Sequence, residues 1–319
     1  ILLPLLVLGI SLFIGRYPRP LFMPLRLLQT DELAQKLVLN LRLPRLITAM
    51  LLGMSLSAAG GVMQMLFRNP LVEPGFLGVT QGAGFGAAIG ILYFSASPLI
   101  IELNATLFAV LGLVLSYFLA RRIRYGGWVL RLVLSGIAVS AIFSAGLGIL
   151  KYMADPATKL PEIVFWLMGG LWSVEWKDLL YILPVIIIGL VIIFLMRWRL
   201  NLLSLSDETA FSLGVAVGRE RTLLLAASVA VTAVVVSVAG IVGWIGLIVP
   251  HLTRRLTSAN AAEFIPVSMS FGAVFAIICD DLARVLTVGE IPLGIITSLI
   301  GATLFLLMMT NRKMRIALR

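Results

Sequence analysis

The sequence predicts an all-α polytopic membrane protein, built as one domain of residues 1–319 with about ten transmembrane helices. Hydrophobic residues make up 60% of the chain and charged residues only 13%. An ordinary soluble domain is about half apolar and about a quarter charged. This apolar excess is too large for one soluble core, so most of it is expected to face lipid or other apolar helices.

The predicted spans are apolar stretches that either cross the hydrocarbon layer or are shortened by glycine and proline. The first lacks a small-residue cleavage site behind it, so we expect a membrane helix rather than a signal peptide. The eighth is short and contains Pro250, so we expect it to cross only in part. The expected segments are residues 1–15, 46–67, 78–95, 98–120, 129–152, 179–197, 222–240, 243–257, 265–285 and 293–311.

The net charge is +10, and the distribution of the basic residues indicates membrane topology rather than nucleic-acid binding. Basic residues gather at the ends of apolar segments, which is the pattern of cytoplasmic loops. Ten spans with every cluster in the cytoplasm would place both termini there. The long first loop is also basic and does not follow this pattern. The clusters are Arg121, Arg122 and Arg124; Arg197, Arg199, Arg219 and Arg221; Arg254 and Arg255; and Arg312, Lys313, Arg315 and Arg319.

The sequence argues against an enzyme and against a resident metal or cofactor. One cysteine, Cys279, and one histidine, His251, cannot form a disulfide, a thiolate metal site or a histidine-rich metal site. The chain has no Gly-x-x-x-x-Gly-Lys-Ser/Thr phosphate loop, so it is not expected to bind ATP in that manner. A transporter of this kind would draw its energy from a partner or from an ion gradient.

Three segments carry small residues at every fourth position, which places each set on one helix face. Such faces let helix backbones approach closely within a membrane bundle. The alternative is that they line a pathway or slide during transport. The three sets are Gly53, Ser57 and Gly61; Gly82, Gly86 and Gly90; and Gly136, Ser140, Ser144 and Gly148.

The loop at about residues 201–221 is predicted to contain a short capped helix. Ser206 is the expected N-cap, with Asp207 and Glu208 in the first turn and Gly214 as the stop. We expect a turn at this glycine between two short helical pieces. Such a helix on the membrane face would suit docking of a partner, although an ordinary interfacial loop fits the same residues.

Asp280 and Arg284 lie four residues apart in the ninth segment, so they are expected to form an ion pair on one helix face. Charged groups this close to lipid need a partner or a wet cavity. We expect Asp281 to face elsewhere and Glu290 to lie in the following loop. The alternative to a structural pair is direct contact with a substrate or a partner protein.

Several stretches together resemble the permease subunits of ATP-driven importers for iron chelates, haem and cobalamin. The longest is Arg68-Asn-Pro-Leu-Val-Glu-Pro-Gly-Phe-Leu-Gly-Val-Thr-Gln-Gly-Ala-Gly84, and the loop at 201–221 and the stretch from Gly243 to Arg254 also match. The likeness runs from about Arg42 to Phe305. It implies a type II importer permease fold in the cell (inner) membrane. It also implies a homodimer with the path at its interface, two ATP-binding cassette subunits that hold ATP and magnesium, and an extracytoplasmic substrate-binding protein.

The resemblance also implies roles for individual residues. Val129 and Leu130 stand where the cobalamin permease has small hydroxyl residues at its cytoplasmic gate, before an arginine matching Arg131. The expected ATPase-coupling residues are Ser206, Asp207, Glu208, Ala210, Leu213, Gly214 and Arg219. The expected gate and pathway residues are Thr80, Gln81, Gly82, Gly86, Val129, Leu130 and Ser140.

The sequence therefore predicts a permease that alternates its access between the two sides of the membrane, with an iron chelate (a siderophore or haem) as the expected cargo. Cobalamin and an oxyanion such as molybdate remain alternatives. An ion-coupled secondary transporter is the rival class, and it is disfavoured because few unpaired acidic residues lie at mid-membrane. A passive channel would have no need of a docking helix.

Overall fold

The computed structural model describes residues 2–18, 21–94 and 97–310, which are almost entirely helical. A two-residue antiparallel pair joins β1 (Ile14–Gly15) to β2 (Leu21–Phe22). The helices are α1 (Leu2–Ser11), α2 (Leu27–Thr30), α3 (Glu32–Lys36), the π-helical η1 (Leu37–Arg42), α4 (Leu43–Leu66), the 3-10 turn η2 (Pro74–Leu77), α5 (Val79–Tyr93), α6 (Pro98–Arg122), α7 (Trp128–Met153), α8 (Lys159–Met168), α9 (Trp176–Leu195), α10 (Arg197–Leu203), α11 (Asp207–Ser212), α12 (Val217–Ala239), α13 (Ile245–Leu256), α14 (Ala261–Val285) and α15 (Leu293–Thr310).

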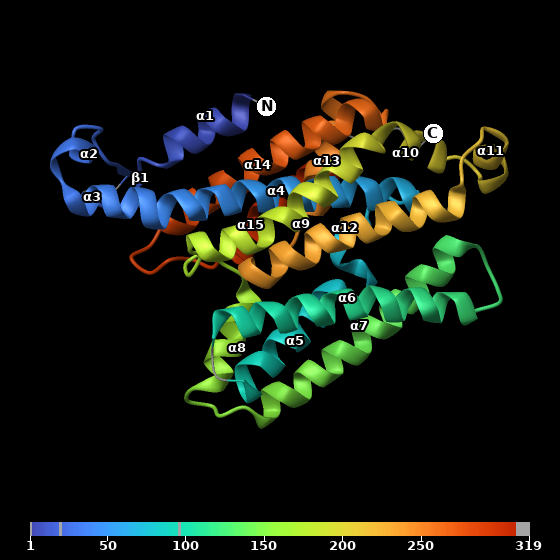
Figure 1. Cartoon of the computed structure of the whole chain (residues 1–319), viewed down its shortest axis with the longest axis horizontal. Coiled ribbons are helices and arrows are strands. Elements are labelled where there is room, and N and C mark those ends of the chain that lie inside the picture. Colours follow the sequence, from blue (N-terminus) through green and yellow to red (C-terminus); the bar gives the residue numbers. More distant parts are fainter. Residues whose placement is uncertain (1, 19–20, 95–96, 311–319) are drawn as a thin grey trace.

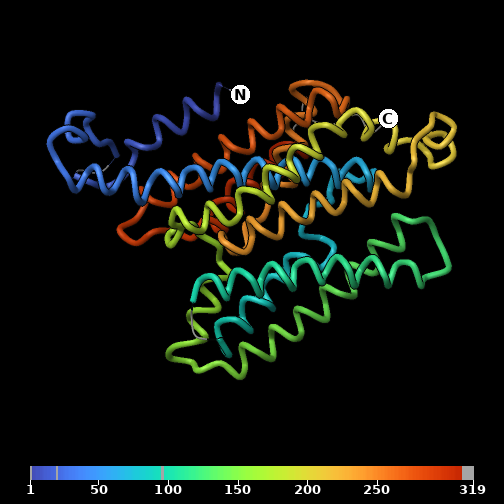
Figure 2. The backbone as a smooth tube through the Cα atoms, in the orientation of Figure 1, coloured from blue at the N-terminus to red at the C-terminus, as the bar shows by residue number. Residues whose placement is uncertain are grey.

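The helices form two groups that pack along α12. Helices α5, α6, α7 and α8 lie together below the rest of the bundle (Figure 1). In the upper group α4 runs through the bundle from one end to the other (Figure 2) and contacts α12, α13 and α14. Contacts of α12 with α5 and α6 join the two groups. The short helix α11 lies at one end of the molecule, and α2 and α3 lie at the other (Figure 1).

The ten expected spans all fall on helices, but the count of ten is not confirmed. Seven described helices are long and apolar enough to cross a membrane. Helices α1 and α5 are apolar but shorter, and α13 has only 12 residues. Residues 1, 95 and 311 of the expected spans, and the basic cluster from Arg312 to Arg319, lie outside the described residues.

The second span begins earlier than the sequence indicated. Helices α3, η1 and α4 form one continuous stretch from Glu32 to Leu66. Arg42 and Arg45 suggested a loop before residue 46, yet both side chains are buried inside this stretch. Arg45 pairs with Asp280 and Glu290, and Arg42 donates to the carbonyl oxygen of Leu12, so the helix continues through both residues.

Glycines bring α4 into backbone contact with two neighbours. A Cβ added at Gly53 would overlap the carbonyl of Gly272 in α14, and one at Gly60 would overlap the carbonyl of Gly246 in α13. In a lipid environment such close approach is a main source of helix association, because apolar side chains gain nothing by leaving lipid. These positions therefore set the distances between the central helices.

The second small-residue set packs α5 against α6. A Cβ at Gly82 would overlap the carbonyl oxygen of Phe108, and one at Gly86 would overlap that of Asn104. In the third set, on α7, only some of the glycines have a close neighbour. Gly136 approaches Leu77, whereas a Cβ at Gly148 would meet no atom within 4 Å. Regular spacing thus predicts the shared face but not which glycines have a close neighbour.

We predict that Gly86→Leu destabilises the folded protein, because a side chain there must displace the backbone of α6. Overpacking of this kind costs about 1–3 kcal/mol in well-packed cores. Gly148→Leu is the matched control, since it adds the same side chain where there is open space. Thermal unfolding in detergent measures both variants. Equal unfolding midpoints for the two variants would show that α5 and α6 can move apart without loss of stability.

Candidate functional site

Helix α11 is a short, capped element that stands out at one end of the bundle. The Ser206 side chain accepts a hydrogen bond from the backbone N–H of Thr209, as expected of an N-cap. Gly214 has a φ of +79°, a left-handed conformation that favours glycine and ends the helix. The long helix α12 follows at Val217, so the loop holds one short helix rather than two.

The side chains of α11 divide into an inner and an outer set. Ala210 is buried and packs inward, so it anchors the helix and is not available to a partner. Phe211 is 76% exposed and Leu213 is 54% exposed, which is unusual for large apolar side chains on a charged face. Glu208 and Arg219 are exposed beside them. The outer surface therefore combines apolar and charged groups around a rigid turn.

An ion pair fastens α11 to α12. The guanidinium of Arg221 donates to both carboxylate oxygens of Asp207, at 2.6 and 3.2 Å. Arg221 is buried, and its guanidinium carbon lies 4.6 Å from the ring centre of Trp128 at the start of α7. The hydrogen bond from Arg221 lowers the pKa of Asp207 below its ordinary value of 3.8. Arg221 therefore connects α11 to both α12 and the start of α7.

Other polar contacts at this end connect α4, α10, α13 and α14. Arg68 donates to the carbonyl oxygen of Leu205, just before α11, and Arg254 donates to Gln64 near the end of α4. Asn201 of α10 donates to Asn260, the N-cap of α14. Of the predicted basic residues, Arg221 pairs with α11 itself, and Arg254 joins α13 to the end of α4.

The expected gate and pathway residues lie on α5 and α7, and the structure does not gather them at one site. Thr80 lines a small cavity of about 40 Å³ together with Glu73 and Thr232. Gln81 and Ser140 are half-buried further along the two helices. Val129 and Leu130 lie in the first turn of α7. Gly82 and Gly86 pack against α6, so a pathway role for them stays a prediction.

A large groove that sequence reasoning missed lies between η2, α13 and α15. Its volume is about 850 Å³, and it is lined by Glu73 and Phe76 of the longest matching stretch, by Trp244 and by Leu299. Trp244 has a φ of +71°, a strained conformation for a residue with a Cβ. Glu73 lines the groove together with Trp244, beside the start of α13. No local pattern in the sequence predicts this groove.

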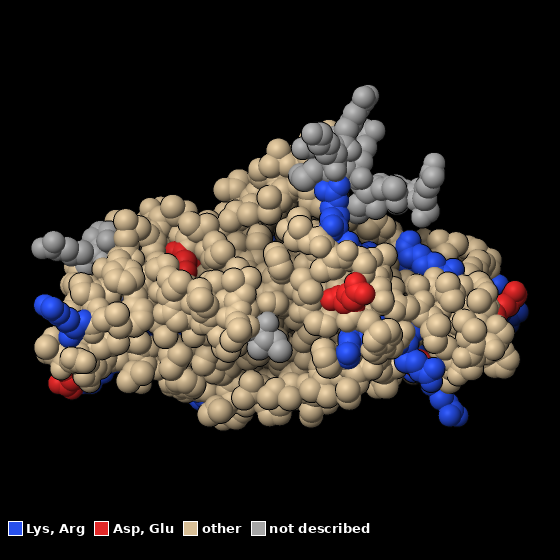
Figure 3. Space-filling model, turned by 90° about the horizontal axis from the view of Figure 1, so that it is seen from above, with Lys and Arg blue, Asp and Glu red and all other residues tan. Residues whose placement is uncertain are grey.

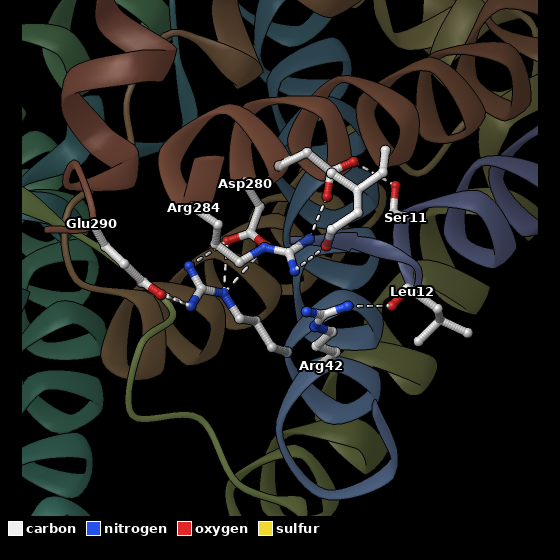
Figure 4. A network of polar contacts seen from close by, with 9 residues as sticks. Ser11, Leu12, Arg42, Asp280, Arg284 and Glu290 are labelled. Atoms are coloured by element: carbon white, nitrogen blue, oxygen red, sulfur yellow. Dashed lines mark hydrogen bonds and ion pairs between the residues drawn. The ribbon is translucent and has the colours of Figure 1, made fainter. Parts of the chain in front are cut away.

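At the opposite end a buried ion network joins α1, α4 and α14 (Figure 4). Arg284 pairs with Asp280, as their spacing predicts, at 3.0 Å between Nε and Oδ2. Arg45 donates to the same Asp280 at 2.9 Å and to Glu290 at 2.8 Å. Asp280 is fully buried, so both arginines compensate one carboxylate in the bundle.

The expectation that Asp281 faces elsewhere is wrong. Arg284 donates to Asp281 as well, and the Ser11 hydroxyl donates to the other carboxylate oxygen. The guanidinium at position 284 reaches both acids because residues three and four apart share a helix face. Arg42 donates to the carbonyl oxygen of Leu12 at 2.9 Å. Among the described residues, no group of three or more His, Cys, Asp or Glu is placed to hold a metal ion.

These features define a multi-pass membrane permease, and comparison with known proteins gives its family. The chain belongs to the FecCD transport family, whose sequence pattern matches residues 2–311. It is therefore a permease subunit of an ABC importer of the FecCD type, and the predicted resemblance is confirmed.

The relatives differ in the cargo that their names give. The molybdate import system permease protein MolB of Haemophilus influenzae is 39% identical over 304 residues, covering 93% of this chain and 89% of that protein. An iron chelatin transport system permease protein of Helicobacter pylori is 41% identical over 283 residues, covering 88% and 84%. A solved structure of a metal-chelate type ABC transporter in an inward-facing conformation is 39% identical, covers 95% of each chain and has a TM-score of 0.87.

We predict that Asp280→Asn destabilises the protein by about 3–5 kcal/mol, the usual cost of breaking a buried ion pair. The reason is that Arg45 and Arg284 would lose their shared carboxylate. Glu290→Gln is the control, because that side chain is 40% exposed and its pair with Arg45 should be worth less than about 1 kcal/mol. Thermal unfolding distinguishes the two. Similar losses for both would contradict a network centred on Asp280.

The lowered pKa of Asp207 predicts how α11 responds to pH. A lowered folded-state pKa stabilises the fold above the ordinary value of 3.8, and this contribution is lost as pH falls through the folded pKa. We therefore expect α11 amides to stay protected at pH 7 and to exchange faster, after correction for intrinsic rates, only well below pH 3.8.

Asp207→Asn should produce that faster exchange already at pH 7, because the neutral amide loses the charge-assisted contact to Arg221. Glu208→Gln is the matched control, since no ion pair of Glu208 is found among the described residues. If Asp207→Asn left α11 as protected as the wild type, the ion pair would not be what holds the helix.

Proposed function

We propose that the chain is the membrane subunit of a binding-protein-dependent importer that moves an iron chelate by alternating access. It works as a homodimer with two ATP-binding cassette subunits, which bind ATP and magnesium. The observation that carries the proposal is α11, a capped helix with exposed apolar side chains, locked to α12 by Asp207 and Arg221. A rigid element of this kind can pass a movement of the ATPase on to the membrane helices.

We place the α11 end in the cytoplasm and the opposite end on the outer side of the cell membrane. The basic residues around α11 support this orientation through the positive-inside rule. On the face seen in Figure 3, uncharged side chains cover most of the surface, and most basic side chains lie toward the right-hand end. In this orientation the extracytoplasmic binding protein docks near α2 and α3, and both chain termini are cytoplasmic.

We propose that the second copy covers the groove beside α13 and α15, so that the path runs along it. Leu299 is 66% exposed and Ile295 is 46% exposed on α15, which leaves an apolar surface beside Glu73. Thr80 and Gln81 would line the adjoining part of the path. Val129 and Leu130, at the start of α7, would form the cytoplasmic gate.

The proposed cargo is taken from the names of similar transporters, because no cargo-binding site has been identified in this chain. An iron chelate is supported by the iron chelatin permease and by the metal-chelate transporter structure. Molybdate is the second candidate, because the relative from Haemophilus influenzae named for molybdate import matches over 93% of the chain. Both cargoes fit the same machine.

Uptake by reconstituted vesicles tests the proposal. The chain, the ATPase and the binding protein from the same gene neighbourhood are combined, and uptake of radioactive iron chelates and of molybdate is measured with and without ATP. We expect ATP-dependent uptake of an iron chelate only with all three components. Uptake by the chain alone, driven by a proton or sodium gradient, would overturn the proposal. If molybdate were taken up and iron chelates were not, the importer mechanism would stand and the cargo would be molybdate.

Gly214→Pro in the same vesicles tests the coupling role. Proline fixes φ near −65°, whereas Gly214 adopts +79°, so the end of α11 must distort. We expect normal membrane insertion, with uptake reduced at least tenfold and the ATPase weakly bound or hydrolysing ATP without transport. Gly127→Pro is the matched control, because Gly127 has a φ of −72° and open space around it. Normal coupling by Gly214→Pro would contradict the role of α11.

A further inference from the structure

A basic cavity of about 310 Å³ lies beside the α11 end, between the last turn of α6 and the first turns of α7 and α12. Arg121 of α6, Arg131 of α7 and Arg221 of α12 line it, together with the rings of Tyr117 and Trp128. Three arginines around one small space repel one another unless an anion joins them. Asp207 is the acid that pairs with one of them, Arg221, and it binds from the α11 side.

Two of these arginines keep buried donor atoms without a partner. The Nε atoms of Arg131 and Arg221 are buried and have no hydrogen-bond partner in the described part of the chain. The Arg221 side chain is only 8% exposed, so it cannot turn out to bulk solvent. A buried donor that is left unpaired is costly, and an anion in the cavity would satisfy it.

The start of α12 adds a third source of positive potential. Gly218, in its first turn, lines the cavity, and a Cβ added there would meet no atom within 4 Å. The N-terminus of a 23-residue helix carries a partial positive charge and free N–H groups. The same turn holds Glu220, which pairs with Arg199 and accepts from the backbone N–H of Ala216, and the space beside Gly218 is open.

The surroundings of the cavity are apolar and favour a lipid over a free ion. Large exposed hydrophobic side chains neighbour its lining residues on two helices: Leu119 is next to Ala120 on α6, and Leu223 is next to Thr222 on α12. These side chains provide a surface for acyl chains next to a place for a headgroup. Basic pockets between membrane helices on the cytoplasmic side are a known way of binding acidic lipid headgroups.

We propose that this cavity binds the phosphate group of an anionic phospholipid, with Arg121, Arg131 and the start of α12 as its partners. The headgroup would occupy the space between the three helices, and the acyl chains would lie along the exposed apolar side chains of α6 and α12. Because Arg221 also holds Asp207, the bound lipid would lie next to the anchor of α11. The assignment does not depend on the cargo or on the ATPase.

The test is native mass spectrometry of the full chain in detergent, titrated with phosphatidylglycerol or phosphatidylcholine. We expect phosphatidylglycerol adducts at concentrations where phosphatidylcholine gives none. Arg121→Gln should weaken phosphatidylglycerol about fivefold, the usual effect of one basic residue near a membrane surface. Arg122→Gln is the matched control, because it removes the same charge from the neighbouring residue outside the cavity, and it should stay within twofold of the wild type.

A second variant keeps every arginine. Gly218→Glu would place a carboxylate in the open space and should reduce phosphatidylglycerol binding at least as much as Arg121→Gln. Gly218→Ala, the control, should leave binding unchanged. Thermal unfolding of each variant checks that the protein is folded. The space at Gly218 is open, so we expect both Gly218 variants to fold.

Four results would overturn the proposal. Equal binding of the two lipids, or equal losses in Arg121→Gln and Arg122→Gln, would show only general attraction to charge. Inorganic phosphate that binds the cavity and is not displaced by phosphatidylglycerol would make it a site for a free anion. Displacement of the lipid by the ATPase subunit, with weaker ATPase binding in Gly218→Glu, would assign the cavity to an acidic segment of that partner.

Discussion

Close contact between helix backbones is the constraint on which the rest of this structure depends. Lipid gives apolar side chains no reason to leave it, so the bundle relies on packing at short range. Glycines let α4 approach α13 and α14 through Gly60 and Gly53. The same contacts position the start of α13, where Trp244 lines the groove together with Glu73. They also align α4 with α14, so that Arg45 reaches Asp280.

Charged groups act at the two ends of this framework in different ways. At one end Asp280 is fully buried and shared by two arginines, which fastens α4 to α14. At the other end Asp207 is largely exposed, and its pair with Arg221 fastens a short outer helix to a long inner one. The first arrangement holds the bundle together. The second leaves α11 on the surface while tying its movement to α12, which contacts α4, α6 and α9.

Local features were predictable from the sequence, and contacts distant in the chain were not. The cap at Ser206 and the stop at Gly214 depend on neighbouring residues, and both are present. The contact between Arg45 and Asp280 joins residues 235 positions apart, and no local pattern encodes it. The charge of the same arginine is why the span was expected to begin at 46, although the helix is continuous from Glu32. The groove between η2, α13 and α15 arises only when separate helices assemble.

Photo-cross-linking from α11 tests most directly the claim that this helix receives the ATPase. A photoreactive amino acid is placed at position 211, where the side chain is 76% exposed, in the chain reconstituted with its partner ATPase. The control position is 152, which is 92% exposed at the far end of α7. The account predicts a cross-link to the ATPase subunit from position 211 and none from position 152. A product from position 152 alone, or an equal yield from both, would contradict it.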